Sequence, residues 1–167
     1  MKNTKVQFLT QGALIAAIYV VLTIAFKPLS FGAIQVRFAE ALTILPLFTP
    51  AAIPGLFVGC LIGNTIGMFV LPDIIFGSIA TLIGALGTFY LRNRTPYIAP
   101  LPPILANTLI IPFILRYAYG VPGSIPLLMG TIGIGEILSC GILGLFLYKL
   151  LRKYPLHLLT GPTQTKL

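Results

Sequence analysis

The chain has 167 residues, of which 57% are hydrophobic and only 8% are charged, and its mean hydropathy is +1.00. Soluble domains carry about 25% charged residues, so this chain lacks the polar surface that a water-soluble globule needs. We therefore expect the lipid bilayer to be its solvent. The net charge of +8 comes from basic residues at the edges of apolar runs, which is typical of a membrane protein and argues against nucleic acid as a partner.

The apolar runs predict six membrane spans packed as one domain over residues 1–167, because a spanning helix needs about 20 apolar residues. The expected bounds are 8–26, 36–48, 51–70, 72–91, 100–117 and 127–151. The predicted fold class is therefore an all-α membrane protein, a six-transmembrane-helix bundle. We interpret the first run as a span rather than a cleaved signal peptide, because it is long and no small-residue cleavage site follows it.

Six spans place both termini on one side of the membrane. With a cytoplasmic N-terminus, the outer side holds only three basic residues, Lys27, Arg37 and Arg116. The cytoplasmic side then holds the others, which are Lys2, Lys5, Arg92, Arg94, Lys149, Arg152, Lys153 and Lys166. Cytoplasmic loops are enriched in Lys and Arg, so this asymmetry predicts cytoplasmic termini in a multi-pass protein of the cell membrane. The tail from Arg152 onward is expected to be polar and flexible.

Small residues predict two surfaces for close helix contact. In the third span, glycines recur every four residues, and small residues let helix backbones approach each other; they are Gly55, Gly59, Gly63 and Gly67. In the first span, Ala13 and Ala17 share one helix face. The partner of that face is either another helix of this chain or a separate membrane protein, and the sequence leaves both open.

The chain has only three acidic residues, and all of them fall in or beside predicted spans: Glu40, Asp73 and Glu136. A charged acid at mid-helix costs about 2.5–3.5 kcal/mol on insertion scales, so each one needs a reason. Glu136 has no basic neighbour within a helical turn, and Gly133, Gly135 and Gly141 make its helix thin enough to admit a ligand. We therefore predict that Glu136 contacts a ligand.

The other two acids have structural alternatives. Arg37 lies three residues before Glu40, so the two would share a helix face and could form an ion pair. Asp73 follows Pro72 where a helix would begin, a place that favours a negative charge. For both acids, a structural role and a contact with ligand stay open.

Several uncharged groups complete the candidate site. Asn64 and Asn107 lie within apolar spans, where their amides either hydrogen-bond to other helices or read the edge of a polar planar ring. Cys60 and Cys140 are expected to be small buried hydrophobic residues. The aromatic residues available for stacking on a ring are Phe31, Phe38, Phe57, Phe69, Tyr117 and Tyr119.

The motifs of common membrane enzymes and ATPases do not occur in the sequence. It has no GxxxxGK[ST] loop, so the chain does not hydrolyse ATP by itself. It has no HExxH motif, and its single histidine, His157, lies in the C-terminal tail. No Ser/His/Asp triad or pair of aspartates can be assembled. We therefore predict a protein that is not an enzyme and that needs no metal or cofactor.

The segments LSFGAIQVRFAEALTILPLFTPAAIPGLFVGCLIGN and LPDIIFGSIATLIGA resemble the QueT family, the substrate-binding S components of energy-coupling factor (ECF) transporters. The similarity continues in ALIAA near the start, in LPP…N from Leu101 to Asn107, and in GE…C from Gly135 to Cys140. Family members usually have Ser before the glutamate of the second span. This chain has Ala39 there, so any hydrogen bond of that serine is missing.

The resemblance implies a six-helix bundle that binds its substrate near the outer face. It implies ATP-driven uptake with one membrane T component and two ATPase subunits, and a queuosine precursor as substrate, a 7-deazaguanine such as the 7-aminomethyl form. Ala13 and Ala17 match the motif by which S components contact the T component. The residues predicted to bind the substrate are Arg37, Glu40, Asn64, Asp73, Asn107 and Glu136.

The alternative is a stand-alone secondary transporter of a small cationic or nucleobase-like solute, in which Glu136 or Glu40 carries a coupling proton. Such folds are often built from internal repeats around a site at the bilayer midplane. The sequence shows no convincing internal repeat, and six spans are few for this class. This absence favours the S component.

Overall fold

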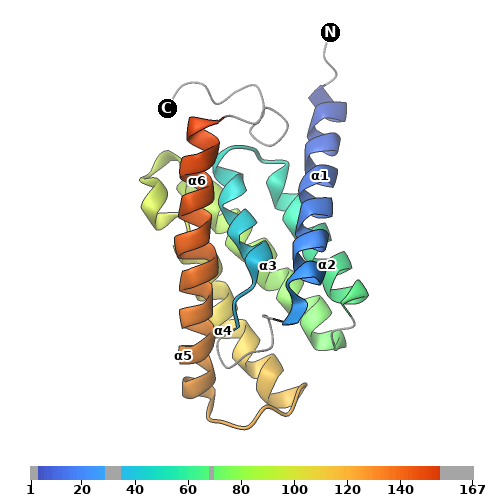
Figure 1. Ribbon diagram of the computed structural model, residues 1–167, viewed down its shortest axis with the longest axis vertical. Coiled ribbons are helices and arrows are strands. Elements are labelled where there is room, and N and C mark those ends of the chain that lie inside the picture. The colour runs from blue at the N-terminus through green and yellow to red at the C-terminus, as the bar shows by residue number, and fades with distance from the viewer. Residues whose placement is uncertain (1–3, 29–34, 68–69, 155–167) are drawn as a thin grey trace.

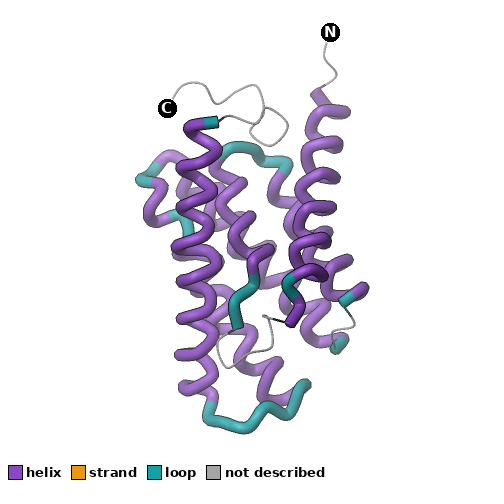
Figure 2. The backbone as a smooth tube through the Cα atoms, viewed as in Figure 1, coloured by secondary structure: helices purple, strands orange, loops and turns teal. Residues whose placement is uncertain are grey.

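Helices form every regular element of the computed structural model over the residues it describes, which are 4–28, 35–67 and 70–154 (Figures 1 and 2). In chain order they are α1 (Thr4–Ala25), η2 (Phe38–Leu47), α2 (Ala52–Ile66), η3 (Asp73–Gly77), α3 (Ser78–Tyr90), η4 (Leu91–Asn93), η5 (Pro96–Ile98), α4 (Leu101–Tyr117), α5 (Ile125–Glu136), η6 (Ile137–Leu143) and α6 (Gly144–Lys153). The predicted all-α class is confirmed.

Four helices are long and apolar enough to cross a membrane: Lys5–Ala25, Asp73–Asn93, Pro96–Tyr117 and Ile125–Lys153. They correspond to the first, fourth, fifth and sixth predicted spans. The second and third predicted spans are the shorter helices Phe38–Leu47 and Ala52–Ile66. The first of these is a 3-10 helix of 10 residues, about 20 Å long, and the second is an α-helix of 15 residues, about 22 Å long. Both are shorter than the bilayer's hydrocarbon core of about 30 Å.

The predicted boundaries need small corrections. Helix α1 begins at Thr4, and the last long helix runs from Ile125 to Lys153, so Arg152 is helical rather than part of the tail. Most of the predicted loop over 28–35 and most of the tail lie outside the described residues. The same holds for Lys2, Phe31, Met68, Phe69, His157 and Lys166.

The exterior is apolar, and the partly apolar interior also holds charged and polar side chains. Large apolar side chains face outward on the long helices, for example Leu9 (69% exposed), Leu105 (57%) and Ile142 (59%). The buried set includes all three acids, both predicted amides and several hydroxyl groups. This arrangement suits a lipid solvent outside and a polar site inside.

The glycine face of the third predicted span makes the close helix contact that was predicted, and its partner is the first helix. A Cβ atom at Gly55 would lie 2.7 Å from the backbone oxygen of Gly12, and one at Gly59 would lie 2.8 Å from Cβ of Tyr19. The α1 and α2 backbones therefore approach each other more closely than side chains at these positions would allow. Ala13 and Ala17 are exposed on another face of α1. The idea that they pack within this chain is therefore wrong.

We predict that Gly55→Ala lowers the free energy of unfolding by about 1–2 kcal/mol, which is an overpacking cost of about 1–3 less a helix-propensity gain of about 0.5–1. Gly130→Ala is the matched control, because Gly130 is also helical but has no atom within 4 Å of an added Cβ. The control should be neutral or stabilising. Thermal unfolding of the two purified variants in detergent measures the difference, and equal melting temperatures would contradict this account of the helix pair.

The short helix η2 lies at the centre of the bundle and contacts α1, α2, α3, α6 and η6. Eight of its ten residues are buried. Pro46 lies inside it and cannot donate a backbone hydrogen bond. Runs of 3-10 helix longer than about four residues are uncommon and often mark functional segments. This segment carries Glu40 into the interior.

The two ends of the bundle differ. The first turn of α1 and the last turn of α6 lie at the same end, and the α4–α5 connection lies at the opposite end (Figure 1). Near that opposite end, a second apolar cluster joins α4 to α5 through Ile111, Ile114, Leu115, Leu128 and Ile132. The polar site described next lies between these ends.

Candidate functional site

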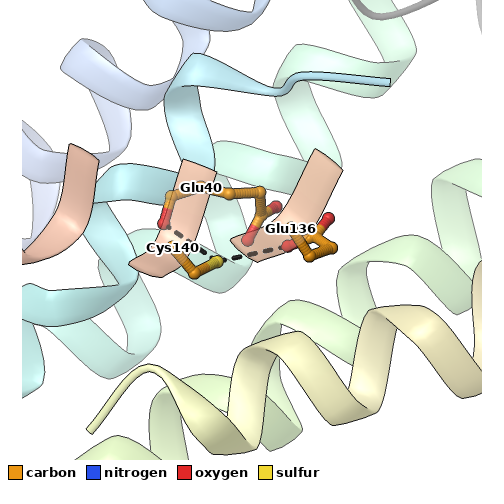
Figure 3. Close-up of side chains that lie close together, drawn as sticks. All are labelled: Glu40, Glu136 and Cys140. Carbon is orange, nitrogen blue, oxygen red and sulfur yellow. Dashed lines mark hydrogen bonds between the residues drawn. The ribbon is translucent and has the colours of Figure 1, made fainter. Parts of the chain in front are cut away.

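Two buried glutamates from distant parts of the chain face each other in the interior. Glu40 comes from η2 and is 0% exposed, and Glu136 ends α5 and is 3% exposed. One carboxylate oxygen of each glutamate and the Cys140 sulfur lie within 4.8 Å of one another (Figure 3). The Cys140 thiol lies 3.2 Å from Glu136 Oε2 and 3.5 Å from the Glu40 carbonyl oxygen. The structure thus joins two of the three predicted acids.

The Glu40 carboxylate is fixed on one side and open on the other. The Tyr19 hydroxyl donates to its Oε1 at 2.5 Å, and the Thr81 hydroxyl donates to the same oxygen at 3.3 Å. The second oxygen, Oε2, is buried and has no hydrogen-bond partner among the described residues. An unpaired buried carboxylate oxygen is costly. It therefore marks a place where a donor from a ligand, or a proton, would bind.

Arg37 pairs with Asp73 and not with Glu40. Its guanidinium Nη2 lies 3.5 Å from Asp73 Oδ2. The Arg37–Glu40 pair, which the sequence left open, does not form, because Arg37 is the extended residue before η2 (φ −99°, ψ 98°) and so does not share a helix face with Glu40. Its backbone N–H donates to the Ser139 hydroxyl at 3.1 Å. Arg37 thus joins the η2 entrance to the α5–η6–α6 helix.

Asp73 has the structural role that the sequence left open, and it also belongs to the polar cluster. It lies in the first turn of η3 after Pro72, as a helix-terminal charge would. It also accepts a hydrogen bond from the Tyr119 hydroxyl at 3.0 Å, while its buried Oδ1 has no partner among the described residues. Burial, together with the nearby Asp73 charge, raises the pKa of Tyr119 to about 12, so its hydroxyl stays a donor at neutral pH.

The two predicted amides have different settings. Asn64 is tied into the structure, because its Nδ2 donates to the Asp73 carbonyl oxygen at 3.3 Å and lies 3.6 Å from the Cys60 sulfur. Gly77 leaves room for this contact, since a Cβ there would lie 3.0 Å from Asp73 Oδ1 and 3.4 Å from Asn64 Nδ2. Asn107 is 2% exposed, and its Nδ2 has no hydrogen-bond partner among the described residues. Asn107 lies beside the Glu136 carboxylate, so its amide donor faces the glutamate pair in the interior.

Two acids adjoin π-helical segments. Asp73 begins the π-helix η3, and Glu136 immediately precedes the π-helix η6. Single π turns inside α-helices occur frequently at functional sites, because they shift the side chains out of the regular helical spacing. The backbone thus supports a functional role for both positions.

Some predicted features are not where the sequence placed them. Gly135 does not open space for a ligand, because a Cβ there would meet the Gln35 backbone oxygen at 2.0 Å. Phe38 stacks on Phe26 with ring centroids 4.3 Å apart. Tyr117 is 78% exposed and faces away from the acids.

The site also contains groups that the sequence analysis did not assign to it. They are Tyr19, Thr43, Thr81, Ser139 and Cys140, and each has a hydrogen bond to Glu40, to Arg37 or within the glutamate pair. Cys140 is buried and has a free thiol, as expected. Its position four residues after Glu136 places both on one helix face, so that spacing was the available signal.

The buried cluster also contains side chains of the types that ligate metal ions. Glu40, Glu136 and Cys140 are the group of potential ligands whose atoms come together among the described residues. Structural metal sites of the zinc type use four ligands, and no fourth His, Cys, Asp or Glu joins this group within the described part of the chain. Asp73, whose Oδ1 is also unpaired, does not belong to this group.

An all-helical bundle with an apolar exterior and a buried cluster of charged side chains has the features of a multi-pass membrane protein. The family model described as QueT transporter matches residues 9–153. The chain belongs to this transporter family, which places it in the plasma membrane and argues against an enzyme.

A relative shows the same relationship over part of the chain. The queuosine precursor transporter QueT of Lactococcus lactis subsp. cremoris (strain MG1363) is 34% identical to it over 85 residues. The aligned region covers 50% of this chain and 50% of that relative, so the chain spans about half the length of the protein it matches. No solved structure matches the chain.

Proposed function

We propose that the chain is the substrate-binding S component of an ECF importer and that it captures a queuosine precursor, a 7-deazaguanine such as the 7-aminomethyl form. The observation that carries the proposal is the buried set of unpaired polar atoms in a chain of the QueT transporter family. Glu40 Oε2 and Asp73 Oδ1 offer acceptors, and Asn107 Nδ2 offers a donor. A guanine-like ring offers the complementary groups, several N–H donors and a carbonyl acceptor.

The charge of the site supports the same ligand class. Three acids and one arginine come together there, so the formal charge is −2 if all of them are ionised. Buried charges are stable only when they are paired and hydrogen-bonded. A ligand with N–H donors and a cationic aminomethyl group would supply both kinds of partner. In this proposal, Glu136, Glu40 and Asp73 accept from the N–H groups of the ligand and Asn107 donates to its carbonyl, while Asn64 and Arg37 shape the site.

The orientation follows from the basic residues. We propose six crossings, with the shared end of α1 and α6 in the cytoplasm, because Arg152 and Lys153 end α6 there. Asp73 and Tyr119 would then lie toward the outer side, from which the substrate enters. The two short helices are too short to make the second and third crossings by helix alone, so flanking non-helical backbone would complete them, which membranes tolerate where protein satisfies that backbone.

The energy source gives a direct test of this assignment. Because the sequence has no phosphate-binding loop, uptake into reconstituted vesicles should require ATP, a T component and two ATPase subunits. The chain alone, under an imposed proton gradient, should accumulate no substrate. Radiolabelled 7-aminomethyl-7-deazaguanine would measure both conditions. Proton-driven accumulation by the chain alone would instead establish the secondary transporter.

A further inference from the structure

A pocket remote from the glutamate pair lies between the end of η2, the η4–η5 connection and α6. It has a volume of about 210 Å³, and its lining includes Phe48, Arg92, Arg94, Tyr148 and Arg152. Its lining residue Arg152 is in the last turn of α6, and this turn lies at the same end of the bundle as the first turn of α1 (Figure 1). Three arginines and two aromatic rings thus meet in one concave surface that the proposed substrate site does not use.

Aromatic contacts hold two of these arginines in place. The Arg92 guanidinium lies 4.0 Å from the centre of the Phe89 ring. Arg152 lies over the Tyr148 ring at 6.0 Å and donates to the Tyr148 hydroxyl at 3.4 Å. The rings of Tyr148 and Phe48 are 5.4 Å apart and form an apolar side of the pocket. Stacking on the Phe89 ring leaves the guanidinium N–H groups of Arg92 available for bidentate contacts with an anion.

The chain itself has no acidic side chain to neutralise this pocket. Its three acids are Glu40, Asp73 and Glu136, and they are 0%, 2% and 3% exposed in the central site. Arg92 and Arg94 form no ion pair within the described residues. Within the described residues, no acidic side chain neutralises the positive charge of the pocket, which therefore suits an anionic ligand.

The surroundings of the pocket place it at a membrane surface. Tyr90 and Tyr97 flank the arginine-bearing connection and are 80% and 65% exposed. Exposed Tyr residues are enriched where a membrane protein meets the headgroup layer. Lipid-facing apolar side chains follow on α6, including Phe146 at 65% exposed. A lipid phosphate would reach the arginines from this layer while its acyl chains cover the apolar surface.

We propose that this pocket binds the phosphate headgroup of an anionic phospholipid from the cytoplasmic leaflet. Basic pockets between membrane helices on the cytoplasmic side are suited to such headgroups, and arginine forks match phosphate geometry. Arg92 and Arg94 supply the charge, and Tyr148 and Phe48 form the wall beside it. This inference does not depend on which substrate the central site takes.

The test is a lipid titration of the purified full chain, with bound lipids counted by native mass spectrometry. Phosphatidylglycerol should bind about 30-fold more tightly to the wild type than to Arg92→Gln/Arg94→Gln, since each basic residue near a lipid surface contributes on the order of fivefold. Lys149→Gln/Lys153→Gln is the matched control, because it removes the same charge from exposed positions of α6 that do not line the pocket. This control should change the affinity less than threefold.

Three results would overturn the proposal. The first is equal binding of phosphatidylglycerol and zwitterionic phosphatidylcholine by the wild type. The second is an equal loss in the lysine control, which would mean diffuse surface charge rather than a pocket. The third is displacement of the lipid by millimolar inorganic phosphate, which would mean a site for a free anion. Retention of one phosphatidylglycerol by the wild type alone, unaffected by phosphate, would support it.

Discussion

Glu136→Gln should abolish tight binding of the deazaguanine without unfolding the protein. In the proposed complex, the carboxylate accepts charge-assisted hydrogen bonds from ring N–H groups, which are roughly twice as strong as neutral ones. The amide replaces one acceptor with a donor, and that donor would face another donor. The loss should be about 2–4 kcal/mol, or on the order of 30- to 1,000-fold in affinity. Titration calorimetry on the purified variant measures it.

Glu136→Gln should not lower the thermal stability of the unliganded protein, in contrast to its effect on substrate affinity. Glu136 faces a second carboxylate, Glu40, within 4.8 Å, so removing one charge reduces repulsion in the unliganded site. The amide oxygen can still accept from the Cys140 thiol, which lies 3.2 Å from Glu136 Oε2. We therefore expect the melting temperature of Glu136→Gln to equal or exceed that of the wild type. A gain in stability with a loss of binding is the trade-off expected at a functional site.

Glu40→Gln tests whether the second glutamate of the pair contributes to substrate affinity as Glu136 does. A smaller effect was expected at this position if Arg37 neutralised Glu40, but Arg37 pairs with Asp73 instead. Glu40 Oε2 is unpaired and available to a ligand, so its substitution should weaken binding to a similar degree. Guanine analogues without the exocyclic amine should bind the wild type poorly and lose less on Glu136→Gln. If Glu136→Gln is folded and binds the deazaguanine within about threefold of wild type, Glu136 is structural and the site assignment fails.

The sequence predicts the helices better than it predicts the contacts of the site. The long spans follow from apolar runs bounded by Pro, Gly and basic residues, which depend on local composition. The glycine face of α2 was also predictable, because its four-residue spacing requires a closely packed partner. The partner itself, α1 with Gly12 and Tyr19, was not, since helix spacing does not say which neighbour is closest.

The pairing of charges could not be predicted because it depends on the shape of one short element. The expected Arg37–Glu40 pair assumes an α-helix that includes both residues, whereas η2 begins at Phe38 and Arg37 is extended. That shift directs Arg37 toward Asp73, 36 residues away in the chain. The meeting of Glu40 with Glu136 likewise depends on η2 packing against η6. Local periodicity contains no information about either contact.

The outer face of α1 provides the second large expected effect. Leu9, Ala13, Ala17 and Val21 lie four residues apart and share that face, where both alanines are exposed while Ala16 and Gly12 pack against α2. A pair of alanines between two larger apolar residues forms a shallow recess in an otherwise lipid-facing surface. Lipid tails do not require such a recess, whereas a closely packed helix of another protein does. We propose that the T component docks there.

Ala13→Leu with Ala17→Leu should therefore block substrate uptake while leaving substrate affinity unchanged. The two leucines fill the recess and keep the partner helix at a distance, but both positions point away from the buried acids. Ala13→Ser with Ala17→Ser is the matched control, because serine is also small enough for close helix contact, and it should keep uptake near the wild-type level. Uptake assays at matched expression, calorimetry on the purified variants and recovery of the ATPase subunits on co-purification separate the two effects. Normal uptake by the leucine variant would mean that this face meets only lipid. A parallel loss of substrate affinity would mean that α1 acts through the substrate site rather than through a partner, because Tyr19 of α1 donates to Glu40.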